Sequence, residues 1–223
     1  MAKGMNLMLL YITVKAKAVA DYIYTVVRYY TRSWRYAVAD SGMMLSYLWR
    51  SPYSLHKKFL IKNGEKDIYT YGETPIRVMK SIAEEANLSV NDTFVELGSG
   101  RGRGVLWANA AYGCKSRGIE IVPFFAKNAE RITKALKFYD VAYDNGDMLV
   151  SDIGDATVVY LYGICLDDIT LHDITRRLEM LPSGARVVTV SEPLKSTQLV
   201  VEKTFTARYP WGEAVLFLHR KKM

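Results

Sequence analysis

Glycine occupies four alternate positions, from residue 98 to residue 104, near the middle of this 223-residue chain. The residues directly before them, Phe94-Val95-Glu96-Leu97, are apolar apart from one carboxylate, which is typical of a buried strand. Glycine permits a tight turn, and the missing Cβ lets the backbone approach a ligand closely. The stretch therefore predicts a ligand-binding turn between a strand and a helix, as found in α/β folds.

The spacing of the glycines distinguishes between classes of nucleotide ligand. A dinucleotide fingerprint, G-x-G-x-x-G, counted from Gly98 would need a third glycine where the chain has Arg103. The pattern E-x-G-x-G-x-G instead resembles that of class I S-adenosylmethionine-dependent methyltransferases. The resemblance implies S-adenosylmethionine as the cofactor, with another nucleotide or a plain glycine-rich turn as the alternatives. The cofactor-binding residues that it implies here are Glu96, Gly98, Gly100 and Gly102.

Two later segments provide further candidates for the same site. Lys115–Ile121 is predicted to be a second strand, and Glu120 near its end follows the glycines by about 20 residues, the interval of a ribose-binding acid. Val141–Met148 contains a third strand and ends in Gly-Asp-Met. There Asp147 could accept the adenine amino group while Met148 packs on the ring, although Gly-Asp pairs also mark ordinary turns.

The rest of the chain completes an α/β pattern of alternating strands and helices. Helices are predicted at Gly104–Tyr112 and Asp168–Leu181, strands at Ala156–Tyr162 and Ala185–Ser191, and a hairpin from Thr204–Tyr209 and Ala214–His219. We expect a seven-stranded, doubly wound, Rossmann-like sheet with a terminal antiparallel hairpin, preceded by a helical N-terminal extension. A terminal hairpin is expected for this methyltransferase class and not for the all-parallel dinucleotide fold.

A narrower resemblance rests on the loop Tyr71-Gly72-Glu73-Thr74-Pro75, which precedes a helix and the glycine-rich stretch. This arrangement resembles the non-SET histone lysine methyltransferases of the disruptor-of-telomeric-silencing type. Later segments, Cys114–Glu120, Gly146–Met148 and Leu181–Val188, are similar to the same family, so the likeness extends from about Tyr71 to Pro193. By resemblance, Glu73 and Thr74 close over the methionine part of the cofactor, and the acceptor is a lysine side chain of a protein.

One segment departs from that family. After strand four the family has Asn-Asn-Phe-Ala-Phe, whereas this chain has Tyr162-Gly163-Ile164-Cys165-Leu166. Membrane-anchored mitochondrial lysine methyltransferases that modify ATP synthase subunit c are similar in lacking the asparagine. We nominate Tyr162 as the catalytic-site residue that lines the acceptor channel, with core packing as the alternative. An Asn-Pro-Pro-Tyr motif is absent here, which disfavours adenine or cytosine as acceptor.

The net charge of +7 lies entirely in the N-terminal third: residues 1–67 carry eleven Lys/Arg and four Asp/Glu, and the remainder carries nineteen of each. This shift predicts two regions, a basic amphipathic helical extension (1–64) and a methyltransferase domain (65–223). Residues 7–36 are predicted to form one long helix or two consecutive ones. The apolar side of this segment contains Leu9, Ile12, Ala16, Val19, Ile23, Val26, Val27, Tyr30 and Trp34, and its polar stripe contains Lys17, Asp21, Arg28, Arg32 and Arg35.

Three partners are open for that apolar side: the domain itself, a bilayer surface, or an acidic macromolecule. The uninterrupted apolar run, residues 5–14, is too short to span a bilayer, and a secretion signal is disfavoured because two lysines precede its cleavage site. A cytoplasmic location is expected, and a peripheral position on the inner face of a membrane is the alternative.

The cysteines and histidines are too scattered in the sequence to indicate a metal site or a disulfide framework. Arg101 and Arg103 are expected to be solvated residues at the start of a helix.

Three functions remain open. The first is methylation of a protein lysine, which makes a protein the substrate. The second is RNA methylation, because basic and aromatic residues occur together in the extension. The third is a membrane-associated, cofactor-binding module without catalysis.

Overall fold

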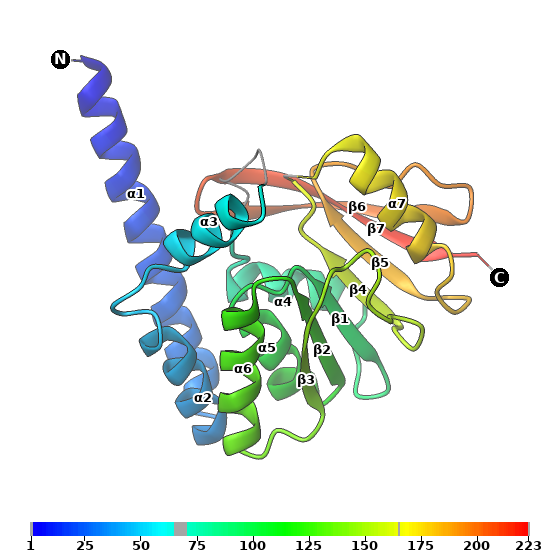
Figure 1. Cartoon of the computed structure of the whole chain (residues 1–223), viewed down its shortest axis with the longest axis horizontal. Helices are drawn as coiled ribbons and strands as arrows, with labels where there is room; N and C mark the ends of the chain where they lie inside the picture. Colours follow the sequence, from blue (N-terminus) through cyan, green and yellow to red (C-terminus); the bar gives the residue numbers. More distant parts are fainter. Residues whose placement is uncertain (1, 65–70, 165, 223) are drawn as a thin grey trace.

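A seven-stranded sheet with the order β3-β2-β1-β4-β5-β7-β6 forms the centre of the protein (Figure 1). The computed structural model describes residues 2–64, 71–164 and 166–222. The strands are β1 (Thr93–Leu97), β2 (Lys115–Glu120), β3 (Val141–Asn145), β4 (Val158–Leu161), β5 (Arg186–Val190), β6 (Leu199–Tyr209) and β7 (Gly212–Lys221). β7 is antiparallel to both β5 and β6, and the other neighbouring strands are parallel. The predicted sheet with its terminal antiparallel hairpin is confirmed.

Helices cover both faces of this sheet. The helices of the α/β region are α4 (Ile76–Glu85), α5 (Arg103–Tyr112), α6 (Pro123–Ala135) and α7 (Asp168–Leu178). Alternate residues of β4 show how the faces are divided, because side chains along a strand point to opposite sides. Val158 and Tyr160 join the core beneath α4, α5 and α6, whereas Val159 and Leu161 join the core beneath α7. The strands are therefore buried on both sides, which explains their nearly continuous apolar sequence.

The N-terminal segment forms four helical elements: α1 (Ala2–Thr25), the π-helix η1 (Val26–Tyr30), α2 (Trp34–Leu45) and α3 (Pro52–Lys62). Two consecutive helices thus replace one long helix over residues 7–36. The break follows from Ser33, whose side chain accepts the Tyr36 N–H and caps α2. The division after residue 64 adjoins residues 65–70, which lie outside the described part of the chain, as does Cys165. The two-region division stays a prediction.

The apolar side of α1 faces away from the α/β region. We call Leu9, Ile12, Ala16, Val19 and Ile23 of α1 the outer stripe; all five side chains are exposed. Tyr30, which belongs to the same predicted apolar side, does pack against the core, so the partner of the outer stripe stays a prediction. At the C-terminal end of α1, Asp21 pairs with Arg77 of α4 at 3.1 Å and Thr25 is buried, so the helix contacts the α/β region there by the side opposite the outer stripe. Within the described residues, none of the helices is long and apolar enough to cross a bilayer.

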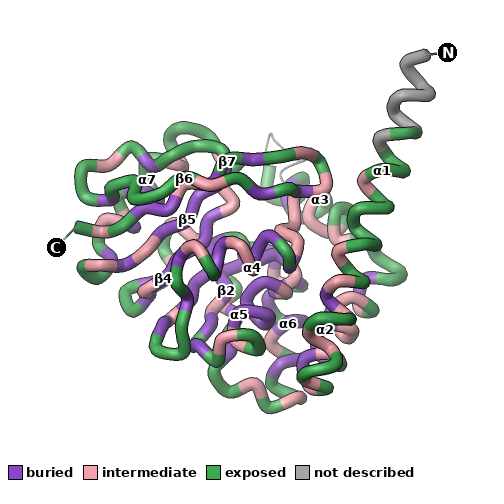
Figure 2. Tube along the Cα trace, turned by 180° about the vertical axis from the view of Figure 1, so that it is seen from behind, coloured by how far each residue is buried: buried purple, intermediate pink, exposed green. Residues whose placement is uncertain are grey.

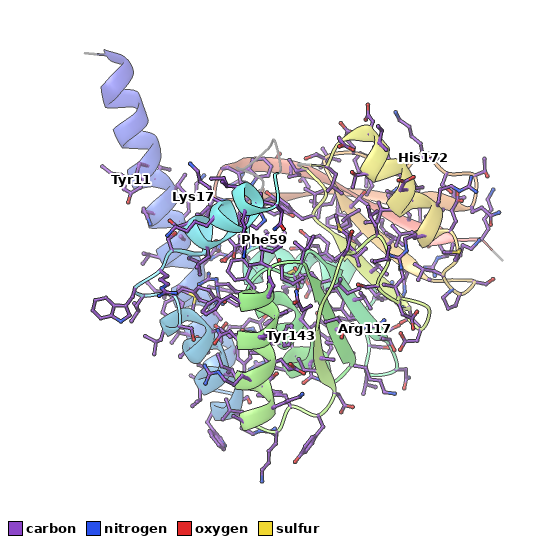
Figure 3. The ribbon with its side chains drawn as sticks, viewed as in Figure 1. Tyr11, Lys17, Phe59, Arg117, Tyr143 and His172 are labelled. Atoms are coloured by element: carbon purple, nitrogen blue, oxygen red, sulfur yellow. The ribbon has the colours of Figure 1, made fainter. Side chains whose placement is uncertain are left out.

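Gly102 ends the glycine-rich turn in a left-handed conformation, with φ at +81°. A Cβ there would lie 2.3 Å from Cε1 of Tyr143, whose buried ring is fixed by a hydrogen bond from its hydroxyl to the Gly102 carbonyl (Figure 3). We expect Gly102→Ala to lower the free energy of unfolding by about 2–5 kcal/mol, measured by urea titration. Gly184→Ala is the control, because Gly184 has φ at +82° and open space around it. Equal losses in the two variants would contradict the proposed clash.

Candidate active site

A cavity of about 320 Å³ lies at the carboxyl ends of the central strands. Its wall includes Gly98, Gly100, Glu120, Asp147, Met148 and Tyr162, together with His56 and Leu60 of α3. β1 has β2 on one side and β4 on the other, so the chain reverses its direction of winding there. Ligands of open α/β sheets bind at this kind of switch point, outside the carboxyl ends of the strands. The volume is within the range of about 300–1,000 Å³ for small-molecule sites.

Glu120 fixes the glycine-rich turn to the end of β2. One carboxylate oxygen accepts the Gly100 N–H at 2.7 Å, and the other accepts the Val122 N–H at 2.8 Å. Gly98 and Gly100 both have positive φ, so the backbone itself forms the wall of the cavity at these positions. Burial raises the pKa of Glu120 to about 7, against the lowering effect of its backbone hydrogen bonds. The carboxylate lies where a ligand hydroxyl could reach its remaining lone pairs.

Asp147 and Met148 form another part of the wall of the same cavity. The Leu149 N–H donates to the Asp147 carboxylate at 2.8 Å, and the Gly146 N–H donates to the Glu120 carbonyl at 3.1 Å. These bonds hold the segment after β3 against the end of β2. The structure thus brings Glu120, Asp147 and Met148 to one cavity; their individual contacts with a cofactor stay predictions.

A smaller cavity adjoins the first and is lined by Glu73, Thr74, Glu96, Ser99 and Arg101, among others. Glu96 is buried, and its Oε2 has no hydrogen-bond partner within the described residues. Burial, followed by the charges of Glu120 and Glu73, raises the pKa of Glu96 to about 8. A buried carboxylate oxygen without a partner is costly, so a hydrogen-bond donor or a cation is the ligand that this cavity suits.

The loop before α4 is attached to the glycine-rich turn through Glu73. Its carboxylate accepts hydrogen bonds from two nitrogens of Arg101 and from the Tyr71 hydroxyl. Burial alone would raise the pKa of Glu73, but the Arg101 guanidinium and the Tyr71 hydroxyl bring it below its usual range. Thr74 is the next residue along the chain, and its hydroxyl is 2.7 Å from the Tyr160 hydroxyl. Glu73 is therefore an ionised carboxylate with its charge already compensated.

The expectation that Arg101 and Arg103 are solvated is wrong. The Arg101 side chain is 10% exposed and lies in the ion pair with Glu73. Arg103 makes two hydrogen bonds to Asp40 of α2, at 2.6 and 2.8 Å, and the Asp40 side chain is fully buried. Arg101 and its partner Glu73 are 28 residues apart in the sequence, and Arg103 and its partner Asp40 are 63 residues apart. The local sequence around the turn does not indicate such distant partners.

Tyr162 lies directly after β4 and borders both cavities. Its hydroxyl accepts a hydrogen bond from the Trp211 indole N–H at 3.0 Å, and Trp211 stacks on Tyr209 with ring centroids 5.2 Å apart. Gly72 is adjacent to the other side, because a Cβ there would be 3.0 Å from the Tyr162 ring. Of these three aromatic residues, Tyr162 lines the cavities, and Tyr209 and Trp211 of the hairpin contact it from outside the cavity walls. Sequence reasoning missed Trp211, since only the fold brings the hairpin turn next to β4.

Two other findings concern single residues. Gly102 lines neither cavity and instead packs on Tyr143. Its predicted role in cofactor binding stays a prediction, and here it would act through the shape of the turn. His56 of α3 lines the larger cavity, with its ring 5.3 Å from that of Tyr71, and burial lowers its pKa. Sequence reasoning gave His56 no role because nothing local marks it. In residues 2–64, 71–164 and 166–222, His, Cys, Asp and Glu form no cluster able to hold a metal ion.

The pKa of Glu96 leads to a prediction about stability. A carboxylic acid whose pKa is raised on folding binds more protons in the native state, so the free energy of unfolding falls as the pH rises toward the folded pKa of about 8. We expect the cofactor-free protein to lose about 1–3 kcal/mol between pH 5.5 and 7.5 through Glu96. Glu96→Gln should remove this loss in urea titrations, whereas Glu84→Gln, at an exposed position of α4, should retain it. The same pH dependence in both variants would argue against a buried, protonated Glu96.

The sheet order, the left-handed glycine turn and the carboxylates around one cavity define a class I S-adenosylmethionine-dependent methyltransferase. The cavity and the partnerless oxygen of buried Glu96 suit a cofactor that carries hydroxyl, amine and sulfonium groups. The family model described as histone methylation protein DOT1 matches residues 60–207. The chain belongs to this DOT1 family, and its cofactor is S-adenosylmethionine.

Curated relatives include two histone-lysine N-methyltransferases that are specific for lysine 79 of H3. The Drosophila melanogaster enzyme is 30% identical over 132 residues, which are 53% of this chain and 7% of that protein. The Caenorhabditis elegans enzyme is 31% identical over 139 residues, which are 55% of this chain and 15% of that protein. The chain therefore corresponds to a small part of each relative.

Among solved structures, an RNA methyltransferase from Salinibacter ruber in complex with S-adenosyl-L-homocysteine is similar. It has a TM-score of 0.58 and 28% identity, and the match covers 68% of this chain and 94% of that one. Geranyl diphosphate C-methyltransferase from Streptomyces coelicolor A3(2) has a TM-score of 0.55 and 16% identity, covering 66% of this chain and 76% of that one. At that identity the second comparison supports the fold alone.

Proposed function

We propose that the chain transfers a methyl group from S-adenosylmethionine to the side-chain amine of a lysine in a protein. The observation that carries this proposal is the DOT1 family match over residues 60–207, which includes the Tyr71–Pro75 loop and every residue that lines the two cavities except His56. The two curated relatives are lysine methyltransferases by name. Because the chain corresponds to only a small part of them, their histone substrate is not carried over.

Bound S-adenosylmethionine supplies an electrophilic methyl group on a sulfonium. In our proposal the larger cavity holds its nucleoside part, with Glu120 accepting from the ribose hydroxyls and Asp147 from the adenine amine. Glu96, Glu73 and Thr74 border the smaller cavity, which would take the methionine part. The partnerless Oε2 of Glu96 supports this assignment, because a cationic amine would restore the missing interaction and lower the pKa of the carboxyl.

Tyr162, which lines both cavities, would guide the acceptor together with the adjoining rings of Tyr209 and Trp211. Aromatic faces attract an approaching ammonium group. A lysine amine, with a pKa near 10.4 when free, must lose a proton before it can attack, and burial among apolar rings favours the neutral form. Orientation of a neutral amine in such a channel can supply about 7–11 kcal/mol, so a strong base is not required. We infer that Tyr162 positions the acceptor and does not itself accept the proton.

RNA methylation is the second candidate. It is supported by 28% identity to the Salinibacter ruber RNA methyltransferase over nearly all of that chain, and by the positive charge of residues 1–67. Phosphate groups would be attracted to such a segment. The lysine proposal is favoured because the DOT1 family match covers more specific features, above all the Tyr71–Pro75 loop.

Radiolabelled cofactor and host lysate can distinguish these candidates. The protein is incubated with both, and the products are treated with proteinase or with ribonuclease. We expect a label that proteinase removes and ribonuclease does not, and that amino-acid analysis identifies as methyl-lysine. Glu120→Ala should give no label, which ties the signal to this chain. A ribonuclease-sensitive label would overturn the lysine proposal, and the absence of label from every fraction would favour the non-catalytic module.

A further inference from the structure

We propose that the outer stripe of α1 binds the surface of an anionic lipid bilayer, with the helix lying in the headgroup plane. The stripe runs at i, i+3, i+4 and i+7 spacing, which places its members along one side of a helix. Ile12 is 51% exposed and Val19 is 58% exposed. An apolar row of this length, left uncovered on a projecting helix, is typical of a surface that binds a partner.

The outer stripe is uncovered because α1 is fixed to the α/β region by its other side. Asp21 pairs with Arg77, the same guanidinium lies 4.9 Å from the ring centroid of Tyr24, and Thr25 is buried. At about 100° per residue these positions lie on the side of the helix opposite Val19. The helix also extends beyond the α/β region toward its N-terminus (Figures 1 and 2). A partner can therefore reach the outer stripe while α1 stays docked.

The charge of this segment selects an anionic partner. Residues 2–64 contain ten Lys/Arg and two Asp/Glu. Both acids, Asp21 and Asp40, are paired with arginines of the α/β region, Arg77 and Arg103. The two carboxylates of this segment are thus engaged by arginines from outside it, the segment carries a net positive charge, and basic residues near the surface attract anionic lipids.

The residues flanking the outer stripe favour a bilayer over a second copy of the chain. A helix pair would place carboxylates opposite cations at the flanking positions, which here are Thr13, Lys15, Ala20 and Tyr22. None of these is acidic. Tyr11 is exposed beside the outer stripe, and Tyr11 and Lys17 extend from the projecting helix (Figure 3). Tyrosine and lysine beside an apolar row match the composition of helices that lie in a membrane interface.

Flotation of the full chain with lipid vesicles tests the proposal. We expect the protein to float with vesicles that contain phosphatidylglycerol, to float poorly with pure phosphatidylcholine, and to be released by high salt. Val19→Glu should lower the bound fraction at least about tenfold, the factor expected when an apolar side chain no longer enters the lipid. Ala18→Glu adds the same charge about 100° away on the helix and should stay within about threefold of the unmodified protein. Unchanged binding of S-adenosylhomocysteine confirms that both variants are folded.

Several results would overturn the proposal. One is the absence of flotation with either vesicle, and another is equal flotation with both, which would remove the role of charge. Equal losses in Val19→Glu and Ala18→Glu would mean that charge alone governs binding. A concentration-dependent dimer in sedimentation velocity, lost in Val19→Glu and present without lipid binding, would assign the outer stripe to a second copy. These results do not depend on the methyl acceptor, so they separate this proposal from the proposed function.

Discussion

Replacing Glu120 with alanine is expected to weaken S-adenosylhomocysteine binding at least about a hundredfold in titration calorimetry at pH 8. The carboxylate accepts two backbone hydrogen bonds, from Gly100 and Val122, and so determines the shape of the glycine-rich turn. Each hydrogen bond to a charged group contributes about 1.5–3 kcal/mol, and the variant also loses the proposed ribose contact. At pH 8 the carboxyl is mostly ionised, because its pKa is about 7.

The control for this prediction is Glu84→Ala. Glu84 is an exposed carboxylate on α4 that pairs with Lys80 one turn earlier. Its loss should leave binding within about twofold, since exposed ion pairs contribute little. If Glu120→Ala bound the ligand as well as Glu84→Ala did, Glu120 would have no role in the donor site. The unmodified protein should also bind more tightly at pH 8 than at pH 6, because protonated Glu120 loses one acceptor site.

Asp40→Ala is expected to lower the free energy of unfolding by about 3–5 kcal/mol, the usual effect of removing one partner from a buried ion pair. The Asp40 side chain is fully buried and accepts hydrogen bonds from Arg103 and, at 2.7 Å, from the Tyr30 hydroxyl. Without it, the partly buried Arg103 guanidinium would lose the carboxylate that accepts both of its hydrogen bonds. Urea titration of the variant against the unmodified protein measures the effect.

Asp21→Ala provides a matched comparison. Asp21 also joins an N-terminal helix to an arginine of the α/β region, but the side chains in this pair are 21% and 55% exposed. Water screens such a pair, so the loss should be at most about 1 kcal/mol. Similar losses in the two variants would mean that burial of the Asp40–Arg103 pair does not govern its contribution.

The sheet could be predicted from sequence because its determinants are local. Alternating strands and helices, the glycines at residues 98 to 104 and the turn Pro210–Glu213 each signal an element or a connection. Carboxylates at strand ends, such as Glu120 and Asp147, followed from the rule that parallel strands present their carboxyl ends together. The structure brings both to one cavity.

What could not be predicted depends on contacts between distant segments. Arg101 and Arg103 follow glycines and read as solvated helix-start residues, yet each meets a carboxylate from a segment far away in sequence. The helical wheel separated the two sides of residues 7–36 but could not show which side faces inward. A single pair, Asp21 with Arg77, accompanies the docking of the polar side. Likewise, only the path of the folded chain brings His56 to the larger cavity and Trp211 to Tyr162.

The hydrogen bond between Trp211 and Tyr162 has a consequence for engineering. The donor cavity is built from the ends of parallel strands, whereas two of the three aromatic rings beside it come from the β6–β7 hairpin. Under the proposed function, in which these rings guide the acceptor, we expect that the choice of acceptor can be changed separately from the affinity for the methyl donor. We expect a chimera that receives the hairpin tip of another methyltransferase to bind S-adenosylhomocysteine with unchanged affinity and to methylate a different acceptor.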